Sequence, residues 1–145
     1  MRILVLHGPN MRALGAREPD VYGSQTLAQL DATLTERARE LGVHLECVQS
    51  DLEGELVERI HSEGVDGIIL NPAGYTHSSV AIRDAVAAVE TPVIEVHVSN
   101  IHAREPFRRR SVIAGACAGQ ISGLGVLGYV AALDVLVRTR SGEAG

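Results

Sequence analysis

The chain has 145 residues, the length of one domain, and a formal net charge of −5. This charge, with a single short basic run at residues 108–110, argues against a protein that binds nucleic acid. No apolar stretch approaches the roughly 20 residues of a membrane span, and residues 3–6 are too few for a signal peptide. Cys47 and Cys117 form no metal-binding or redox motif, so we expect a cytoplasmic protein.

The basic residues are all of one kind. Every one of the thirteen is an arginine, and the chain contains no lysine. Chemistry that needs a lysine is therefore excluded, including Schiff-base catalysis, a phosphate-binding lysine and a lysine general base.

Short apolar runs alternate with helical patterns along the chain. The predicted strands are residues 3–6, 44–49, 67–70, 92–96 and 119–122. The predicted helices lie over 27–41, between Ser50 and Gly64, over 79–89 and over 124–138. Strands that alternate with helices form a parallel sheet covered on both faces. Right-handed crossovers favour the order 2-1-3-4-5, which is a flavodoxin-like, doubly wound, three-layer α/β fold in a single domain, residues 1–145.

Capping signals mark the ends of two of these helices. Thr26 with Gln29 forms a capping box before the first helix, and Gly42 follows its last turn. Ser50 with Glu53 offers the same pattern before the second helix, for which Gly64 is the expected stop. We therefore expect these helices to begin directly after Thr26 and Ser50.

Polar residues gather in the loops that follow the first, third and fourth strands. These loops are residues 8–10, 71–79 and 97–102. In an open parallel sheet, ligands bind outside the carboxyl ends of the strands, at the point where the strand order reverses. Here that point lies between the first and third strands. We therefore expect the functional site at this edge of the sheet.

Gly123, Gly125 and Gly128 form a G-x-G-x-x-G pattern, which also occurs in dinucleotide-binding proteins. That fingerprint needs a further strand and an acidic residue about 20 positions on, but only seventeen residues follow Gly128. We interpret the glycines as sites of close helix–sheet packing.

Two other flavodoxin-like functions also lack support. The loop after the first strand lacks the Ser/Thr-rich segment that would bind the phosphate of a flavin, and Asn71 stands where a response regulator needs an aspartate.

Three histidines, His77, His97 and His102, lie in the predicted site loops. The spacing of His97 and His102 is wrong for two ligands on one helix face, and no cysteine is near them. The pattern therefore does not favour a metal site. The other histidines are interpreted as surface or packing residues: His7, His44 and His61.

The segment Glu95-Val96-His97 ends the fourth strand. Positions two apart point to the same face of a strand, so the Glu95 carboxylate lies beneath the His97 ring. Such a carboxylate fixes the tautomer of the imidazole and favours its protonated form. The pair suits a general acid, although two polar side chains at a strand end could also satisfy only each other.

Residues 8–23 form a loop of about fifteen residues, a length at which loops are often lids or binding loops. The loop carries Arg17 and Tyr22. A tyrosine acts as a base only as its phenolate, which an always-charged arginine favours. With His97 as an acid and amide groups to bind an enolate, the set suits proton removal next to a carbonyl and loss of a β-hydroxyl.

Four segments share a pattern with one known family. They read GPN…LG.REP..YG (8–23), N…THSS (71–79), IEVHVSNIHARE.FRR.S (94–111) and GLG..GY..AL (123–133). Together they resemble type II 3-dehydroquinate dehydratase, a small enzyme of the shikimate pathway, over essentially the whole chain. The resemblance implies a cofactor-free trans elimination of water from 3-dehydroquinate through an enolate, in the biosynthesis of aromatic amino acids. It also implies assembly of the chains into trimers and dodecamers.

The resemblance further implies the catalytic roles of matching residues. Tyr22 removes the proton next to the ketone. Arg17 keeps Tyr22 ionised and stabilises the transition state, and Asn10, through a water, stabilises the enolate oxygen. His97 protonates the leaving hydroxyl with support from Glu95.

Binding roles follow from the same resemblance. Val98 and Ser99 receive the substrate carboxylate, largely through backbone N–H groups. Asp84 is the residue that a neighbouring subunit contributes, although its position alone fits an exposed helix face equally well. The residues implied to bind substrate hydroxyls are Asn71, His77 and Arg108.

The chain departs from the family pattern in two places. Met11-Arg12 replaces Leu-Asn or Leu-Gly and adds a positive charge to the lid, and residues 72–74 read PAG rather than PGA. Neither change touches an implied catalytic residue.

Two other classes of function compete with the dehydratase. One is a flavodoxin-like module that binds a small anion without chemistry, and the other is a nucleotide-dependent enzyme.

Overall fold

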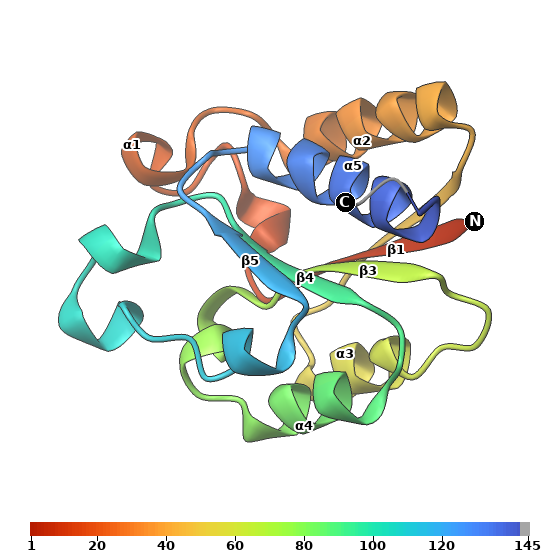
Figure 1. The fold of residues 1–145 in the computed structure, drawn as a ribbon. Coiled ribbons are helices and arrows are strands. Elements are labelled where there is room, and N and C mark those ends of the chain that lie inside the picture. Colours follow the sequence, from red (N-terminus) through yellow and green to blue (C-terminus); the bar gives the residue numbers. More distant parts are fainter. Residues whose placement is uncertain (143–145) are drawn as a thin grey trace.

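Five parallel strands form one sheet, and helices cover both of its faces (Figure 1). The computed structural model describes residues 1–142. The strands are β1 (Arg2–His7), β2 (His44–Gln49), β3 (Gly67–Asn71), β4 (Val93–His97) and β5 (Gly119–Ser122). Their order is β2-β1-β3-β4-β5, and all neighbouring strands pair in parallel. The predicted flavodoxin-like fold is confirmed.

The longer helices pack in two layers, with α2 and α5 on one face of the sheet and α3 and α4 on the other (Figure 1). These helices are α2 (Leu27–Leu41), α3 (Glu53–Ile60), α4 (Val80–Ala88) and α5 (Leu127–Arg140). Within residues 1–142, no helix is long and apolar enough to cross a membrane.

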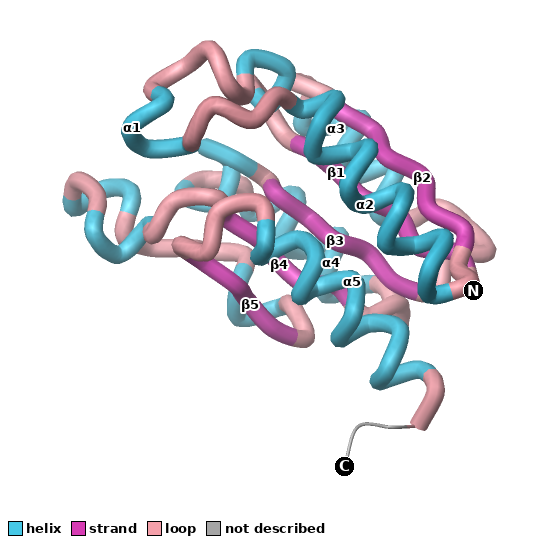
Figure 2. Tube along the Cα trace, turned by 90° about the horizontal axis from the view of Figure 1, so that it is seen from above, coloured by secondary structure: helices cyan, strands magenta, loops and turns pink. Residues whose placement is uncertain are grey.

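Short helical turns fill the loops at one end of the sheet. Figure 2 shows α1 (Pro19–Tyr22) at the end of the strands opposite the N-terminus. The 3-10 turns that follow β1, β3 and β4 are η1 (Met11–Ala13), η2 (Ala73–His77), η3 (Ile101–Ala103) and η4 (Pro106–Arg108). A further turn, η5 (Ala114–Ala116), instead precedes β5 and contacts α4. The loops expected to form the functional site are therefore partly helical, which limits the positions that their side chains can take.

Two apolar clusters hold the layers against the sheet. Ile3 and Val5 of β1 pack with Leu34 on the α2 and α5 face, whereas Leu4 and Leu6 pack on the α3 and α4 face. The faces alternate because successive residues of a strand point in opposite directions. Each fully buried aliphatic side chain contributes about 1.5–3 kcal/mol. The clusters thus fix the strands whose carboxyl ends carry the polar loops.

The first predicted capping box is confirmed and the second is wrong. Thr26 Oγ1 accepts from the Gln29 N–H at 3.2 Å, and the Gln29 side chain accepts from the Thr26 N–H. Ser50 instead accepts from the Leu52 N–H, and Leu52 is itself the residue before α3. The Ser50 hydroxyl makes a local turn that ends at Leu52, just before the helix. The helix also ends at Ile60, before the predicted stop, Gly64.

The closing helix begins three residues after its predicted start at Leu124. Gly123 and Gly125 have φ values of 87° and 59°, in the left-handed region that a right-handed helix cannot include. The helix can begin only beyond them, and α5 starts at Leu127.

The predicted close packing of a glycine against the sheet is confirmed for Gly128. A Cβ at that position would lie 3.2 Å from Ile121 Cγ2 and 3.5 Å from Val96 Cγ1. The missing side chain lets the first turn of α5 approach β4 and β5 closely. Gly125 differs, because it is required by its backbone angle and no atom lies within 4 Å of its Cβ position.

Replacement of Gly123 by Ala is expected to lower the free energy of unfolding by about 1–3 kcal/mol. The new Cβ would lie 2.9 Å from the Asn100 Cβ, on a backbone with φ of 87°. Urea denaturation followed by circular dichroism measures the change. Gly54→Ala in α3 is the control, because nothing lies within 4 Å of its Cβ position, and it should not destabilise. Equal losses in both variants would contradict this account.

Candidate active site

One cavity of about 240 Å³ lies at the carboxyl ends of β1, β3 and β4. Its walls come from the loops that follow these three strands and from α1. The structure brings most of the predicted site residues together there: Asn10, Arg17, Tyr22, Asn71, His77, His97, Val98, Ser99 and Arg108. The cavity lies at the sheet edge where a doubly wound fold binds its ligands.

His97, the last residue of β4, lines the cavity and is held by Glu95. His97 Nε2 lies 2.6 Å from Glu95 Oε1. The Glu95 side chain is completely buried and also accepts hydrogen bonds from the hydroxyls of Thr76 and Ser111. Because Nε2 of His97 is engaged, Nδ1 is the ring nitrogen left for a ligand.

The environment of Glu95 keeps this carboxyl ionised. Burial raises its pKa, but hydrogen bonds from His97, Thr76 and Ser111 outweigh that effect, so the pKa lies below its ordinary value. The ionised carboxylate holds the His97 imidazole in one orientation at the cavity. The arrangement therefore suits a ring that exchanges a proton with a ligand in the cavity.

Arg104 contacts the Tyr22 hydroxyl directly. Its Nη1 donates to the phenol oxygen at 2.5 Å, and its guanidinium carbon lies 5.3 Å from the ring centre. The Arg104 side chain is 14% exposed, so water screens its charge only partly. The phenol oxygen of Tyr22 therefore lies directly against a group that is always positively charged. The two side chains thus supply the phenol and the positive charge from which a tyrosine base is built.

Arg17 lines the cavity, but it lies farther from the Tyr22 ring than Arg104 does. Its guanidinium carbon lies 6.0 Å from the Tyr22 ring centre, and its Nε lies 3.8 Å from a Glu18 carboxylate oxygen. The sequence names Arg17 as the partner of the phenol, whereas the structure places Arg104 on the hydroxyl. The sequence did not point to Arg104 as a partner of Tyr22, because the two residues lie 82 positions apart in the chain. The one sign of its importance was its place in the third family-like segment, residues 94–111.

The predicted lid, residues 10–24, begins at a fixed point. Asn10 has a φ of 67°, a left-handed conformation that asparagine tolerates better than most residues. Its N–H donates to the Asp51 carboxylate at 3.0 Å, and Arg12 forms an ion pair with the same carboxylate. Arg12, which departs from the family pattern, thus helps to hold the first turn of the predicted lid in place. Tyr22 lies at the other end, on the last position of α1.

Backbone donors lie beside His97. Val98 and Ser99 line the cavity and are almost fully buried. Within residues 1–142, their N–H groups donate to no protein acceptor. Successive free N–H groups can bind an anion. This part of the cavity is therefore suited to a carboxylate.

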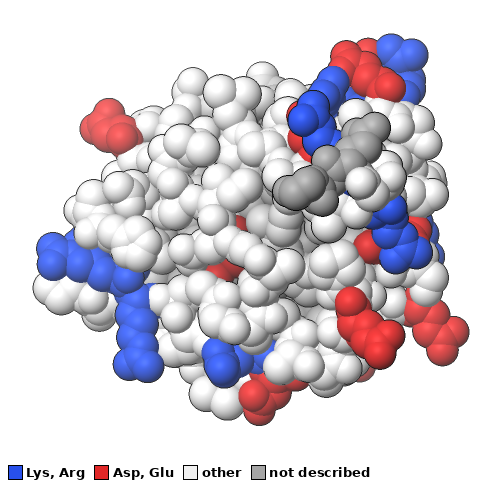
Figure 3. Space-filling model, viewed as in Figure 1, with Lys and Arg blue, Asp and Glu red and all other residues white. Residues whose placement is uncertain are grey.

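Three arginines line the cavity: Arg17, Arg104 and Arg108. Of these, Arg108 lies 3.2 Å from the Glu105 carboxylate. Nδ1 of His77 donates to the Arg110 carbonyl at 2.8 Å. In Figure 3, basic side chains gather at the left edge, over the segment that carries η3 and η4 in Figure 1. Positive charge here favours a negatively charged ligand.

Two of the predicted or considered residues lie away from the cavity. Asp84 is exposed on α4 and does not line the cavity of its own chain. His102 is exposed in η3 and does not line it either. For Asp84, the prediction concerns a neighbouring chain and so stays a prediction.

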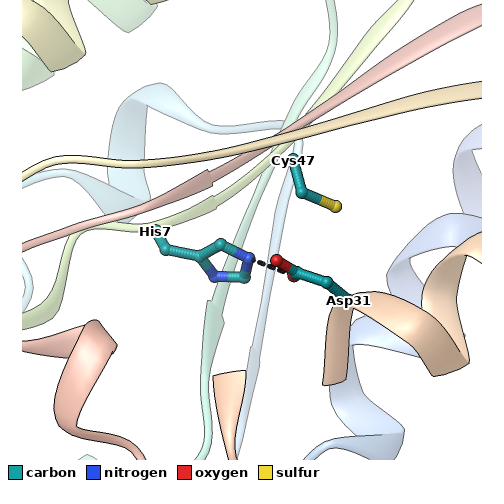
Figure 4. A group of neighbouring side chains, drawn as sticks. All are labelled: His7, Asp31 and Cys47. Carbon is teal, nitrogen blue, oxygen red and sulfur yellow. Dashed lines mark hydrogen bonds and ion pairs between the residues drawn. The ribbon is translucent and has the colours of Figure 1, made fainter. Parts of the chain in front are cut away.

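Of the two roles expected for His7, surface or packing, the structure shows packing. Its ring is fully buried, and its Nε2 lies 2.8 Å from Asp31 Oδ1 (Figure 4). His7, Asp31 and Cys47 offer three possible metal-ligand atoms within 4.8 Å of one another. Burial raises the pKa of the Cys47 thiol to about 12, so the sulfur is protonated at neutral pH. His44 and His61 are exposed, as predicted.

Comparisons with known proteins agree with this geometry. The family described as "Dehydroquinase class II" matches residues 1–137. A relative from Desulforudis audaxviator, named 3-dehydroquinate dehydratase, is 60% identical over 139 residues, covering 94% of this chain and 93% of its own. A relative of the same name from Anoxybacillus flavithermus is 56% identical over 145 residues, covering 99% and 98%.

A solved structure supports the same assignment. The type II dehydroquinase from Butyrivibrio crossotus is 44% identical, with a TM-score of 0.92, and the match covers 94% of this chain and 97% of that one. The similarity thus extends over the strands, the cavity loops and the helices. The chain therefore belongs to the class II dehydroquinase family.

Proposed function

We propose that this protein dehydrates 3-dehydroquinate to 3-dehydroshikimate in the biosynthesis of aromatic amino acids, and that residues 1–145 form a single catalytic domain. One observation carries the proposal: His97, which is held by the buried Glu95, lines the same cavity as Tyr22 and Arg104, which are bonded to each other. Loss of water needs one proton removed from carbon and one added to the leaving oxygen. These two pairs supply both transfers without a cofactor.

The first step removes the proton next to the ketone. Tyr22 takes this proton as a phenolate, and the electron pair moves onto the ketone oxygen to form an enolate. The guanidiniums of Arg17 and Arg104 stabilise the phenolate, and Arg17 also stabilises the charge of the transition state. Asn10, through a water molecule, stabilises the enolate oxygen.

The second step expels the β-hydroxyl. The enolate electrons re-form the ketone and make the new carbon–carbon double bond, while the carbon–oxygen bond breaks. His97 gives its proton to the departing oxygen, which leaves as water. Glu95 holds the ring in position and compensates the charge of the protonated imidazole.

The remaining cavity residues bind the substrate. The N–H groups of Val98 and Ser99 receive its carboxylate. The side chains proposed to bind its hydroxyls are Asn71, His77 and Arg108.

We also propose a cytoplasmic location. It is supported by the two cysteines, Cys47 and Cys117, which are both free thiols in the structure.

The wild-type protein incubated with 3-dehydroquinate tests the proposed function. Dehydration creates a carbon–carbon double bond conjugated to the ketone, and the product therefore absorbs in the ultraviolet. We expect absorbance to rise in proportion to enzyme concentration. A chain that binds the substrate without any rise would be an anion-binding module. Thermal stabilisation by NAD or FMN would instead favour the nucleotide-dependent alternative.

Replacement of Arg104 by Ala is expected to lower kcat by about 10- to 100-fold. The variant keeps Tyr22 but removes the donor 2.5 Å from its hydroxyl, so the phenolate loses its nearest positive charge. Steady-state kinetics measure the change. Arg138→Ala is the control, because it removes an equal charge from the exposed side of α5 and should leave kcat unchanged. Similar losses in both variants would exclude a specific role for Arg104.

The active assembly is proposed to be a trimer, with trimers joined into a dodecamer, in which Asp84 completes the site of a neighbouring chain. Asp84 is exposed and lies outside its own cavity, as such a role requires. Asp84→Ala should then lower kcat without lowering the thermal stability of the chain.

Mixed oligomers test the role of Asp84 across the interface. We expect that Asp84→Ala and Tyr22→Phe chains, each of low activity, recover activity when unfolded and refolded together. A mixed trimer can pair an intact Tyr22 with an Asp84 from its neighbour. Absence of recovery in mixed oligomers verified by mass spectrometry, or a fully active monomer in sedimentation, would contradict this arrangement.

A further inference from the structure

A chain of four polar side chains crosses the core from the cavity to the surface. Asn71 Nδ2 donates to the Tyr129 hydroxyl at 2.8 Å, that hydroxyl lies 3.3 Å from His7 Nδ1, and His7 Nε2 lies 2.8 Å from Asp31 Oδ1. His7 and Tyr129 are completely buried, Asn71 is 3% exposed, and the Asp31 side chain is 31% exposed. Figure 4 shows the outer end of the chain, where the His7 ring points at the Asp31 carboxylate.

The four side chains come from four elements. His7 and Asn71 end the neighbouring strands β1 and β3 and are partners in the parallel register. Tyr129 lies on α5 and Asp31 on α2. The chain therefore ties both helices of one layer to the strand ends that build the cavity.

The hydrogens along this chain can be assigned in one direction. The Ala73 N–H can only donate, and it meets Asn71 Oδ1 at 3.0 Å, so the amide nitrogen of Asn71 faces Tyr129. The phenol oxygen thus accepts from Asn71, and its own hydrogen is free for His7 Nδ1. The Asp31 carboxylate only accepts, so the His7 hydrogen is on Nε2. Each of the three bonds then has one donor and one acceptor.

The consequence for the cavity concerns Asn71. One hydrogen of its amide nitrogen is used by Tyr129, and its oxygen is used by Ala73. The second hydrogen has only the Met11 sulfur, a weak acceptor, at 3.6 Å. The amide therefore presents a donor to the cavity, and it cannot turn over without breaking bonds on both sides.

We propose that Tyr129 and His7 are positioning residues that hold Asn71 as a hydrogen-bond donor to an oxygen of the substrate. The inference rests on the proposed function, because it takes Asn71 as a substrate-binding residue. Packing alone does not require the hydroxyl of Tyr129, since a phenylalanine ring would fill the same space. The hydroxyl instead satisfies two buried polar groups at once, and one of them reaches the cavity.

Steady-state kinetics of Tyr129→Phe test the role of the hydroxyl. We expect KM to rise about tenfold while kcat changes by less than about threefold, because substrate binding is lost and the acid and base remain. Tyr75→Phe is the matched control. It removes a hydroxyl that donates to the Asp51 carbonyl at 2.9 Å, outside the cavity lining, and should leave KM within about twofold. An unchanged KM in Tyr129→Phe would overturn the proposal.

A double-mutant cycle separates positioning from a general loss of packing. If Tyr129 acts through Asn71, then Tyr129→Phe should raise KM by less than about twofold in an Asn71→Ala background. A rise as large as in the wild-type background would overturn the proposal.

If Tyr129→Phe fails to fold, Asp31→Leu weakens the same chain of hydrogen bonds from its surface end. That variant should raise KM by about threefold, and Asp31→Asn, whose oxygen still accepts from His7, should restore it. Equal KM values for Leu and Asn would count against the chain.

The tautomer of His7 gives a test that does not depend on activity. Nitrogen-15 NMR of the histidine-labelled protein, with the His7 signals assigned by their loss in His7→Gln, should show a hydrogen on Nε2 and none on Nδ1. Observation of the opposite tautomer would overturn the proposal even for an active enzyme. A wild-type protein that shows the expected tautomer but no turnover of 3-dehydroquinate would instead contradict the proposed function.

Discussion

Replacement of Tyr22 by Phe is expected to lower kcat at least about a hundredfold, the usual range for removal of a general base. The ring stays in place on α1, so its packing beside Arg104 is kept, but the atom that takes the proton is gone. Substrate affinity should therefore change only by about two- to threefold. Kinetics give kcat, and calorimetric titration of the inactive variant with substrate gives the dissociation constant.

Tyr75→Phe is the control for this change, because it removes the same atom from a ring outside the cavity lining. Its kcat should match that of the wild-type protein. If Tyr22→Phe kept more than about a tenth of the wild-type kcat, another group would have to be the base.

Replacement of His97 by Ala is expected to lower kcat by about 100-fold or more. Hydroxide is a poor leaving group, and the variant lacks the acid that protonates it. Glu95→Gln should cause a smaller loss, because the amide keeps a hydrogen-bonding atom near the ring although it loses the charge. Initial rates with 3-dehydroquinate measure both effects.

The structure adds a condition to this comparison. Glu95 is completely buried and accepts from Thr76 and Ser111 as well as lying against His97, so Glu95→Gln disturbs three contacts. Thermal unfolding should therefore accompany the kinetics. A folded Glu95→Gln variant with a lower kcat than His97→Ala would exchange the roles assigned to the two residues.

The fold could be predicted because its signals are local. Apolar runs such as residues 67–70, helical spacing, and the capping box of Thr26 with Gln29 all act within a few residues. The capping box predicted at Ser50 failed because Ser, Thr and Asn side chains also form turns outside helices. Leu52 separates the Ser50 turn from α3, and no sequence pattern distinguishes this turn from a cap.

The site was predictable only in part. The contact of His97 with Glu95 followed from the two-residue repeat of a strand, which holds their side chains on one face. The contact of Tyr22 with Arg104 depends on how two loops meet in space, and no periodicity links them. The burial of His7 beneath α2 and α5 has the same origin. It results from tertiary packing of a residue whose neighbours in the chain give no sign of it.

The bond between Tyr22 and Arg104 has a consequence for protein engineering. Tyr22 belongs to the predicted lid, residues 10–24, but the arginine on its hydroxyl belongs to the segment after β4. A lid grafted alone from one homologue into another would bring the tyrosine without the loop geometry that places its arginine. The lid is therefore not a portable module, and chimeras should exchange residues 10–24 together with residues 98–108.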